Sequence, residues 1–181
     1  MASTPEIAAD EDREQYISSP SPMGFTPKIA VDEASRELYK ALMRGKNASV
    51  LQLCQEFPDG SLQVVTIHRD TVLHVATSCK QADWVRDLLK MIKDDQLGKL
   101  TIQNKVGNTI LHEASTSDKF VGAAEEMLNK APELLNMCNK FGVTPLYRSV
   151  VFGRMDMFKF FDEKIRTQKQ TTAHGDLEAD K

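Results

Sequence analysis

The sequence has no long apolar run, no secretory leader and few cysteines, and each shortage excludes a class of protein. None of its 181 residues belongs to an apolar stretch of about 18 residues or more, so we expect no membrane-spanning helix. Residues 1–12 lack the basic start and apolar core of a secretory signal. Three cysteines, an odd number at wide spacing, argue against a disulfide framework and predict a reducing, cytoplasmic compartment.

Excess positive charge is also missing. The formal net charge is −3, and residues 1–31 account for it with five acidic and two basic side chains. The other residues carry equal numbers of acidic and basic groups, so they lack the positive field that attracts nucleic acid. We therefore expect a protein partner and no nucleic-acid ligand.

The short motifs of common enzymatic and metal chemistry are absent. The sequence contains no phosphate-binding glycine loop, no nucleophile elbow, no Cys-x-x-Cys pair and no calcium loop. His112 and Glu113 look like the start of a zinc-protease helix, but position 116 is Thr and the second ligand is missing. We predict no catalysis, no cofactor and no metal site.

Composition divides the chain into two polar ends and a central region. Residues 1–31 are acidic and rich in proline and serine, which predicts a disordered leader. Ser19 and Ser21 each precede a proline there, so the leader is either a site of proline-directed phosphorylation or a flexible spacer. Residues 32–166 carry the apolar residues of a core, and residues 167–181 predict a polar tail.

A six-residue motif recurs through the central region. It reads Thr-Val-Leu-His-Val-Ala at 71–76, Thr-Ile-Leu-His-Glu-Ala at 109–114 and Thr-Pro-Leu-Tyr-Arg-Ser at 144–149. The leucines are 38 and then 35 residues apart, and Leu38 and Ala41 keep the register one unit earlier. Leucines nine residues before each threonine, and apolar residues 17 or 18 after it, follow the same period. The pattern indicates four copies of one structural unit.

This period and the Thr-x-Leu-His-x-Ala motif resemble the ankyrin repeat, a turn followed by two helices over about 33 residues. Asn and Gly in residues 104–109 and 139–144 suit the tight turn of its hairpin finger. Arg69 replaces that glycine in the second unit, so we expect an irregular finger there, and residues 94–98 should lengthen the next loop. The resemblance implies an all-α ankyrin-repeat solenoid of about four stacked helix-turn-helix units with hairpin fingers, at approximately residues 32–60, 66–98, 104–131 and 139–166.

One segment narrows the resemblance further. Residues 131–136, Ala-Pro-Glu-Leu-Leu-Asn, and the Gly-Val-Thr-Pro-Leu-Tyr that follows are similar to plant ankyrin proteins of the accelerated-cell-death type. Those proteins carry a C-terminal membrane (PGG) domain after their repeats, which is absent here, so the chain resembles their N-terminal part or a truncated relative. The resemblance implies a scaffold in stress or defence signalling, located in the cytoplasm or, for a longer family member, at the inner face of the plasma membrane.

Stacking of the units would assign structural roles to the repeated positions. Leu73, Leu111 and Leu146 should face inward from each first helix, while Ala76 and Ala114 should let neighbouring helices approach closely.

The histidines and cysteines admit two interpretations each. His74 and His112 are either a metal or acid–base pair, or structural groups that bridge a threonine hydroxyl and the turn backbone of the next unit; the register favours the bridge. Cys54 is predicted to lie in the core. Cys79, near the end of a first helix, is either an inert surface group or a reactive thiol.

The implied fold presents a concave surface of finger tips and first-helix ends, where proteins bind. Phe141, Val151 and Phe152 would form an apolar end of it, with Phe152 either a partner anchor or a contact of the fourth unit's own second helix. The predicted partner-binding residues are Met43, Arg44, Ser78, Cys79, Val106, Asn108, Thr116, Ser117, Phe141, Val143, Val151 and Phe152.

Residues 155–162, Met-Asp-Met-Phe-Lys-Phe-Phe-Asp, are too apolar for the outer cap of a repeat array. We expect an exposed apolar face there, to be covered by further repeats, by the tail or by another chain, so self-association is one hypothesis. For function, the main hypothesis is a non-enzymatic protein-binding scaffold. The alternative is a thiol-based redox sensor or an enzyme that uses Cys79 or His74.

Overall fold

The computed structural model describes residues 33–175, which fold as α-helices joined by turns and 3₁₀ helices. Within this range there is no β-strand, and one isolated bridge joins Val64 and Thr71. The expected all-α class is confirmed. The α-helices are α2 (Glu33–Met43), α3 (Asn47–Glu56), α4 (Val72–Ser78), α5 (Ala82–Lys90), α6 (Ile110–Ala114), α7 (Val121–Lys130), α8 (Pro145–Val151) and α9 (Met155–Gly175), and the 3₁₀ helices are η1 (Gly60–Leu62), η2 (Asp94–Thr101), η3 (Asp118–Phe120) and η4 (Pro132–Asn136).

Several expectations concern residues beyond this range. The disordered leader at 1–31, the phosphorylation of Ser19 and Ser21, and the last part of the polar tail, 176–181, all lie outside the described residues.

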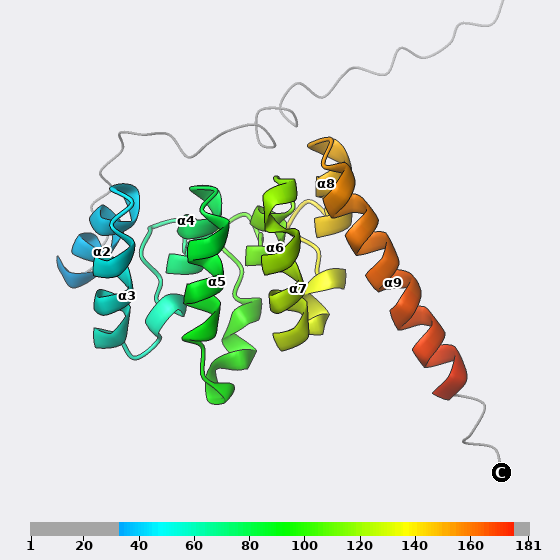
Figure 1. Cartoon of the computed structure of the whole chain (residues 1–181), viewed down its shortest axis with the longest axis horizontal. Helices are drawn as coiled ribbons and strands as arrows, with labels where there is room; N and C mark the ends of the chain where they lie inside the picture. Colours follow the sequence, from blue (N-terminus) through cyan, green and yellow to red (C-terminus); the bar gives the residue numbers. More distant parts are fainter. Residues whose placement is uncertain (1–32, 176–181) are drawn as a thin grey trace, which may run out of the picture.

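Consecutive α-helices form pairs, and the pairs lie side by side in chain order (Figure 1). The pairs are α2 with α3, α4 with α5, α6 with α7, and α8 with α9. The first helices of neighbouring pairs contact one another, as α4 contacts α6, and so do the second helices, as α5 contacts α7. Each of the two inner pairs therefore buries one face against the pair before it and another against the pair after it.

The repeated threonine starts the first helix of a pair. Thr71 Oγ1 accepts the backbone N–H of His74 at 3.3 Å, and Thr144 Oγ1 accepts that of Tyr147 at 3.2 Å. Such a cap satisfies a donor that the first turn of a helix leaves without a partner. Pro145 follows Thr144 at the first helical position, where a missing N–H costs nothing.

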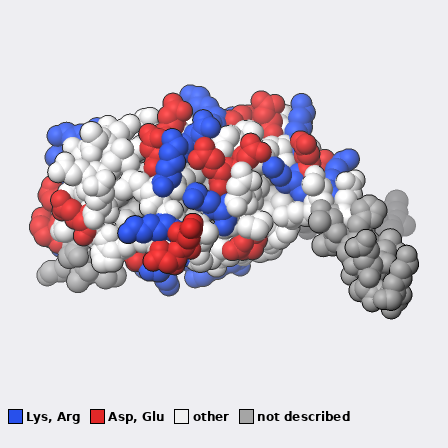
Figure 2. All heavy atoms as spheres, turned by 60° about the horizontal axis from the view of Figure 1, so that its bottom comes forward, with Lys and Arg blue, Asp and Glu red and all other residues white. Residues whose placement is uncertain are grey.

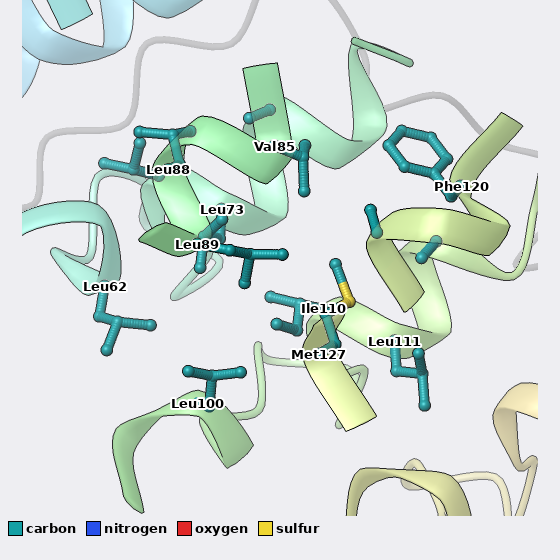
Figure 3. Close-up of a cluster of buried hydrophobic side chains, with 14 of the residues drawn as sticks. Leu62, Leu73, Val85, Leu88, Leu89, Leu100, Ile110, Leu111, Phe120 and Met127 are labelled. Atoms are coloured by element: carbon teal, nitrogen blue, oxygen red, sulfur yellow. The ribbon is translucent and has the colours of Figure 1, made fainter. Parts of the chain in front are cut away.

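The core consists of the periodic apolar positions, as the close-up in Figure 3 shows for the second and third pairs. Leu73 and Leu111 are fully buried, and so are Ala76 and Ala114, which allow close contact between first helices. Leu146 is only half-buried, because no described helix pair follows α8 and covers its far side. Leu146 is thus less buried than Leu73 and Leu111 because it belongs to the last described pair.

The last helix departs from the sequence analysis in two ways. α9 continues past Arg166, the predicted end of the repeats, to Gly175 and thus includes residues assigned to the polar tail; residues 167–174 include no helix breaker. Met157 and Phe161 are fully buried against the preceding pair, so the expected exposed apolar face includes neither of them. Residues 94–98, expected to lengthen a loop, lie in η2.

Candidate partner-binding surface

Three hairpin turns, which we call fingers, precede the first helices of the last three pairs. They comprise residues 66–70, 104–108 and 139–143. In the second of them, Asn104 Oδ1 accepts the N–H groups of Val106 at 3.1 Å and Asn108 at 3.0 Å, and Asn139 repeats this arrangement one finger later. Gly107 takes the left-handed conformation (φ 84°) that the turn requires. The asparagine and glycine of the sequence pattern therefore fix the shape of the finger.

The first finger reaches the same shape with different residues. Thr66 Oγ1 accepts the N–H groups of His68 at 3.1 Å and Asp70 at 3.0 Å, in the place of the asparagine amide oxygen. Arg69 has a φ of 64°, the left-handed conformation that glycine adopts in the other fingers. The finger closes through the N–H of Val65, one residue earlier than the equivalent bond elsewhere. The expected irregularity is in this closing bond and not in the turn.

Backbone hydrogen bonds connect each finger to the next. The N–H of Lys105 donates to the carbonyl of His68 at 2.7 Å, and the N–H of Lys140 donates to the carbonyl of Val106 at 3.1 Å. The fingers are therefore held in a row, and the backbone of each finger keeps its position relative to its neighbours.

The two histidines bridge helix starts to the following finger. The Nδ1 atoms of His74 and His112 lie 2.8 and 2.9 Å from the hydroxyl of the threonine three residues earlier. Their Nε2 atoms lie 3.1 Å from the carbonyl oxygen of Asn108 and 2.9 Å from that of Val143. Because a carbonyl oxygen only accepts, Nε2 carries the proton and Nδ1 accepts. Both ring nitrogens are thus used in the bridge that the repeat register favoured.

Burial lowers the pKa of both imidazoles, since it disfavours the charged form. The pKa of His112 falls to about 4, and that of His74 is also below its ordinary value. Both rings are therefore neutral near pH 7, which suits structural groups. Within residues 33–175 no three His, Cys, Asp or Glu side chains come together as metal ligands would.

The sequence analysis missed an ion pair, which lies between the third and fourth helix pairs. Glu113 Oε2 is 3.3 Å from Arg148 Nη2, and each side chain is 15% exposed. Glu113 Oε1 accepts the amide N–H of Asn108 at 2.9 Å, and the Arg148 guanidinium lies 5.5 Å from the centroid of the Phe152 ring. The signal was present, since Glu113 and Arg148 occupy the same register position in consecutive units and carry opposite charges.

Asn108 is not available to a partner, contrary to our prediction from the finger register. Only 5% of it is exposed. Its Oδ1 accepts from the Asn139 amide at 2.9 Å, its Nδ2 donates to Glu113, and its carbonyl accepts from His74. Its carbonyl and side-chain oxygens serve contacts with the neighbouring pairs, and its side-chain nitrogen binds Glu113 of its own pair, so we reassign it as a structural residue.

The other predicted partner-binding residues differ in how far they reach the surface. Phe141 on the last finger is 50% exposed and Val151 at the end of α8 is 43% exposed. Phe152 is half-buried beside Arg148. Of the rest, the exposed residues are Met43, Arg44 and Ser78, and the half-buried residues are Cys79, Val106, Thr116, Ser117 and Val143.

Burial also governs the thiols. Cys54 lies in the core, where burial raises its pKa to about 12. Cys79 is half-buried, and burial raises its pKa as well. Cys138 is exposed. A raised pKa reduces the thiolate fraction at neutral pH, and the thiolate is the reactive form.

On the face shown in Figure 2, positive and negative side chains are interspersed. Ion pairs connect second helices of neighbouring pairs: Arg86 lies 2.8 Å from Glu126, and Lys164 lies 3.2 Å from Glu125. This face has no large area of one charge. Among the described helices, none combines the length and apolar character that crossing a bilayer requires.

Comparisons with known proteins give a likeness of fold. No family model matches the chain, and no curated protein matches it. A chain in the crystal structure of the yeast ribosomal protein Rps3 in complex with its chaperone Yar1 superposes with a TM-score of 0.58 at 20% sequence identity. The match covers 75% of this chain and 95% of that chain.

Proposed function

We propose that residues 32–166 form four ankyrin repeats and that the chain is a non-enzymatic scaffold that binds a protein partner through its fingers and first-helix ends. The recurrent Thr-x-Leu-His-x-Ala motif supports the repeat assignment, together with the histidine bridges and the row of linked fingers.

The observation that carries the proposal is the exposure of Phe141 and Val151 on a backbone that hydrogen bonds hold in place. Phe141 lies on a finger whose turn is fixed by Asn139 and whose Lys140 N–H donates to the preceding finger. Large apolar side chains on a rigid support make good anchors, because little conformational entropy is lost when they become buried. Phe152 adds a second aromatic ring at this end of the binding surface, and the Arg148 guanidinium lies beside that ring.

The partner, in this proposal, is a protein with an apolar patch that covers this end of the surface. The structure with the similar fold is itself a complex of two proteins, a ribosomal protein and its chaperone. The resemblance to plant ankyrin proteins suggests a role in stress or defence signalling in the cytoplasm. In a longer family member that carries the membrane domain, this role would be exercised at the inner face of the plasma membrane.

Binding is favoured over the thiol alternative by the surroundings of Cys79 and His74. Burial raises the pKa of Cys79, and both ring nitrogens of His74 are engaged in hydrogen bonds. Neither group is prepared for nucleophilic or acid–base chemistry.

A pull-down from plant extract tests the proposal. We expect the Phe141→Asp, Val151→Asp double variant to lose the proteins that the native chain retains, because two charges would need desolvation within the contact. The matched control is Met155→Asp, which places the same charge on an exposed apolar residue at the start of α9. Recovery of the same proteins by all three chains would show that the finger surface is not the binding site.

A further inference from the structure

Charge is divided unevenly between the two halves of the last three helix pairs. The first halves, which hold the fingers and the first helices, carry seven basic and three acidic side chains, a net charge of +4. The second halves, which hold the second helices and the turns after them, carry nine basic and ten acidic side chains, a net charge of −1. The first halves are residues 66–80, 104–119 and 139–154, and the second halves are residues 81–103, 120–138 and 155–175.

The three acidic side chains of the first halves are engaged in contacts within the fold. Asp70 Oδ1 accepts the amide N–H of Asn104 at 2.9 Å, and its Oδ2 accepts a threonine hydroxyl at 2.7 Å. Glu113 lies in its ion pair with Arg148, and Asp118 Oδ1 accepts a backbone N–H of α9 at 3.0 Å. All three are half-buried, so none is free to pair with the exposed cations of these segments.

Each finger carries one exposed cation, and we call Arg69, Lys105 and Lys140 the basic row. Within the described residues, none of the three forms an ion pair. The hydrogen bonds that join the fingers involve the backbone of Lys105, of Lys140 and of the residue before Arg69, so neighbouring cations cannot separate. Like charges held on adjacent turns repel one another, and a bound counter-charge would relieve that repulsion.

An apolar anchor stands at the end of the basic row. Phe141 directly follows Lys140 and is 50% exposed. A ligand that matches both features has acidic groups for the row and an apolar group beside them. Exposed aromatic side chains favour protein partners, since they supply contact area that a purely ionic ligand does not use.

The basic row is too short for the two common polyanions. Juxtamembrane recognition of anionic lipid relies on clusters of about 4–8 Lys or Arg residues. Nucleic-acid binding relies on a domain that is strongly basic overall, whereas the formal net charge of this chain is −3. An acidic segment of a protein requires neither of these properties.

We propose that the fingers take an acidic segment of the partner protein, which lies along the basic row and places an apolar residue against Phe141. The inference rests on the proposed function and specifies the chemistry of the partner. Because exposed ion pairs are individually weak, the row acts mainly by selecting the partner and speeding its association, while the aromatic anchor holds it.

Selection from a phage-displayed library of random peptides, with the full-length chain as bait, tests this chemistry without knowledge of the partner. Peptides of about 12 residues suit the test, because they reach about 40 Å when extended. We expect the selected peptides to be enriched in Asp and Glu over the unselected library, with a large apolar residue beside the acidic run.

The Lys105→Glu, Lys140→Glu variant reverses two charges of the row and keeps the backbone N–H groups that join the fingers. Lys93→Glu, Lys159→Glu is the matched control, since it makes the same change of charge at two exposed lysines of the second halves. In about 0.15 M salt, charges more than about 8 Å away are screened. By fluorescence anisotropy, we expect a selected peptide to bind the row variant about 10-fold or more weakly and the control within about twofold.

Far-UV circular dichroism must show native helix content for each variant; Lys105→Gln, Lys140→Gln, with an expected loss of about threefold, replaces the row variant if it does not. Three outcomes would overturn the inference: selected peptides without acidic enrichment, equal binding of acidic peptides by the native chain and the row variant, or an equal loss in the control. So would the selection of no peptide, as would follow if the acidic segment 1–31 of this chain filled the row. Row-dependent binding of an oligouridine RNA or of phosphatidylserine vesicles would also overturn it.

The failure of this inference can be told from the failure of the proposed function. Apolar peptides that the Phe141→Asp, Val151→Asp variant no longer binds, and that the row variant binds normally, would leave the finger surface as the binding site and reject only the acidic partner. Peptides that bind all the variants equally would reject both.

Discussion

Two glycines at the same turn position should differ in how much an added methyl group destabilises the protein. Gly107 and Gly142 both have a left-handed backbone, with φ of 84° and 71°. A Cβ on Gly107 would lie 2.6 Å from the backbone nitrogen of Lys140 in the next finger. A Cβ on Gly142 would have no neighbour within 4 Å.

The magnitudes follow from these surroundings. Gly142→Ala should cost about 1 kcal/mol, the penalty for a left-handed conformation in a residue that has a Cβ. Gly107→Ala bears the same penalty and must also push the Lys140 backbone away. Overpacking of this kind costs about 1–3 kcal/mol, and loss of the hydrogen bond from Lys140 to Val106 adds about 1 kcal/mol. We expect a total of about 3–5 kcal/mol for Gly107→Ala.

Urea unfolding of the native chain and both variants measures this difference, with the dependence on urea expected to stay unchanged. Equal destabilisation by the two substitutions would refute the reasoning, because it would mean that the fingers are not held in contact. A large loss at Gly142 alone would mean that a further group covers the last finger.

Two further predictions concern titratable groups. The pKa of His112 is about 4 in the folded chain and near 6.5 when unfolded, so the unfolded chain takes up the proton first as pH falls. The stability that this difference contributes is complete above pH 6.5 and is lost between pH 6.5 and 4, a decrease of about 3 kcal/mol. His112→Asn should flatten this part of the pH profile of unfolding free energy. For the thiols, a maleimide at pH 7 should modify the exposed Cys138 at least about tenfold faster than Cys79, as mass spectrometry of peptides would show. Preferential labelling of Cys79 would restore the redox hypothesis.

The sequence was most informative where burial repeats with the period of the motif. Leu73, Leu111, Ala76 and Ala114 could be identified as buried because each helix pair covers the same positions of its neighbour. A periodic environment leaves a periodic pattern of residue types, and this pattern predicts burial without knowledge of the details.

Roles that depend on the next unit were harder to predict. Asn108 was expected at the surface because its position in the finger suggested a tip. It is buried because Glu113 and Asn139, which come from two other segments, supply partners for both ends of its amide. Such a hydrogen-bond network depends on which side chains meet where two helix pairs pack together. The position of a residue within its own repeat unit does not predict those partners.

In two of the four pairs, the residue at the histidine position links its own pair to the next one. In the second and third pairs, the imidazole Nε2 atoms of His74 and His112 donate to a carbonyl of the following finger. A buried imidazole without that carbonyl would keep an unsatisfied N–H, which costs free energy. In the fourth pair the position is Tyr147, which is 57% exposed. Tyr39 holds the same register position in the first pair and is half-buried although another pair follows it, so a tyrosine there does not mark an end of stacking. A histidine at this position marks instead a pair that is bridged to the carbonyl of the next finger.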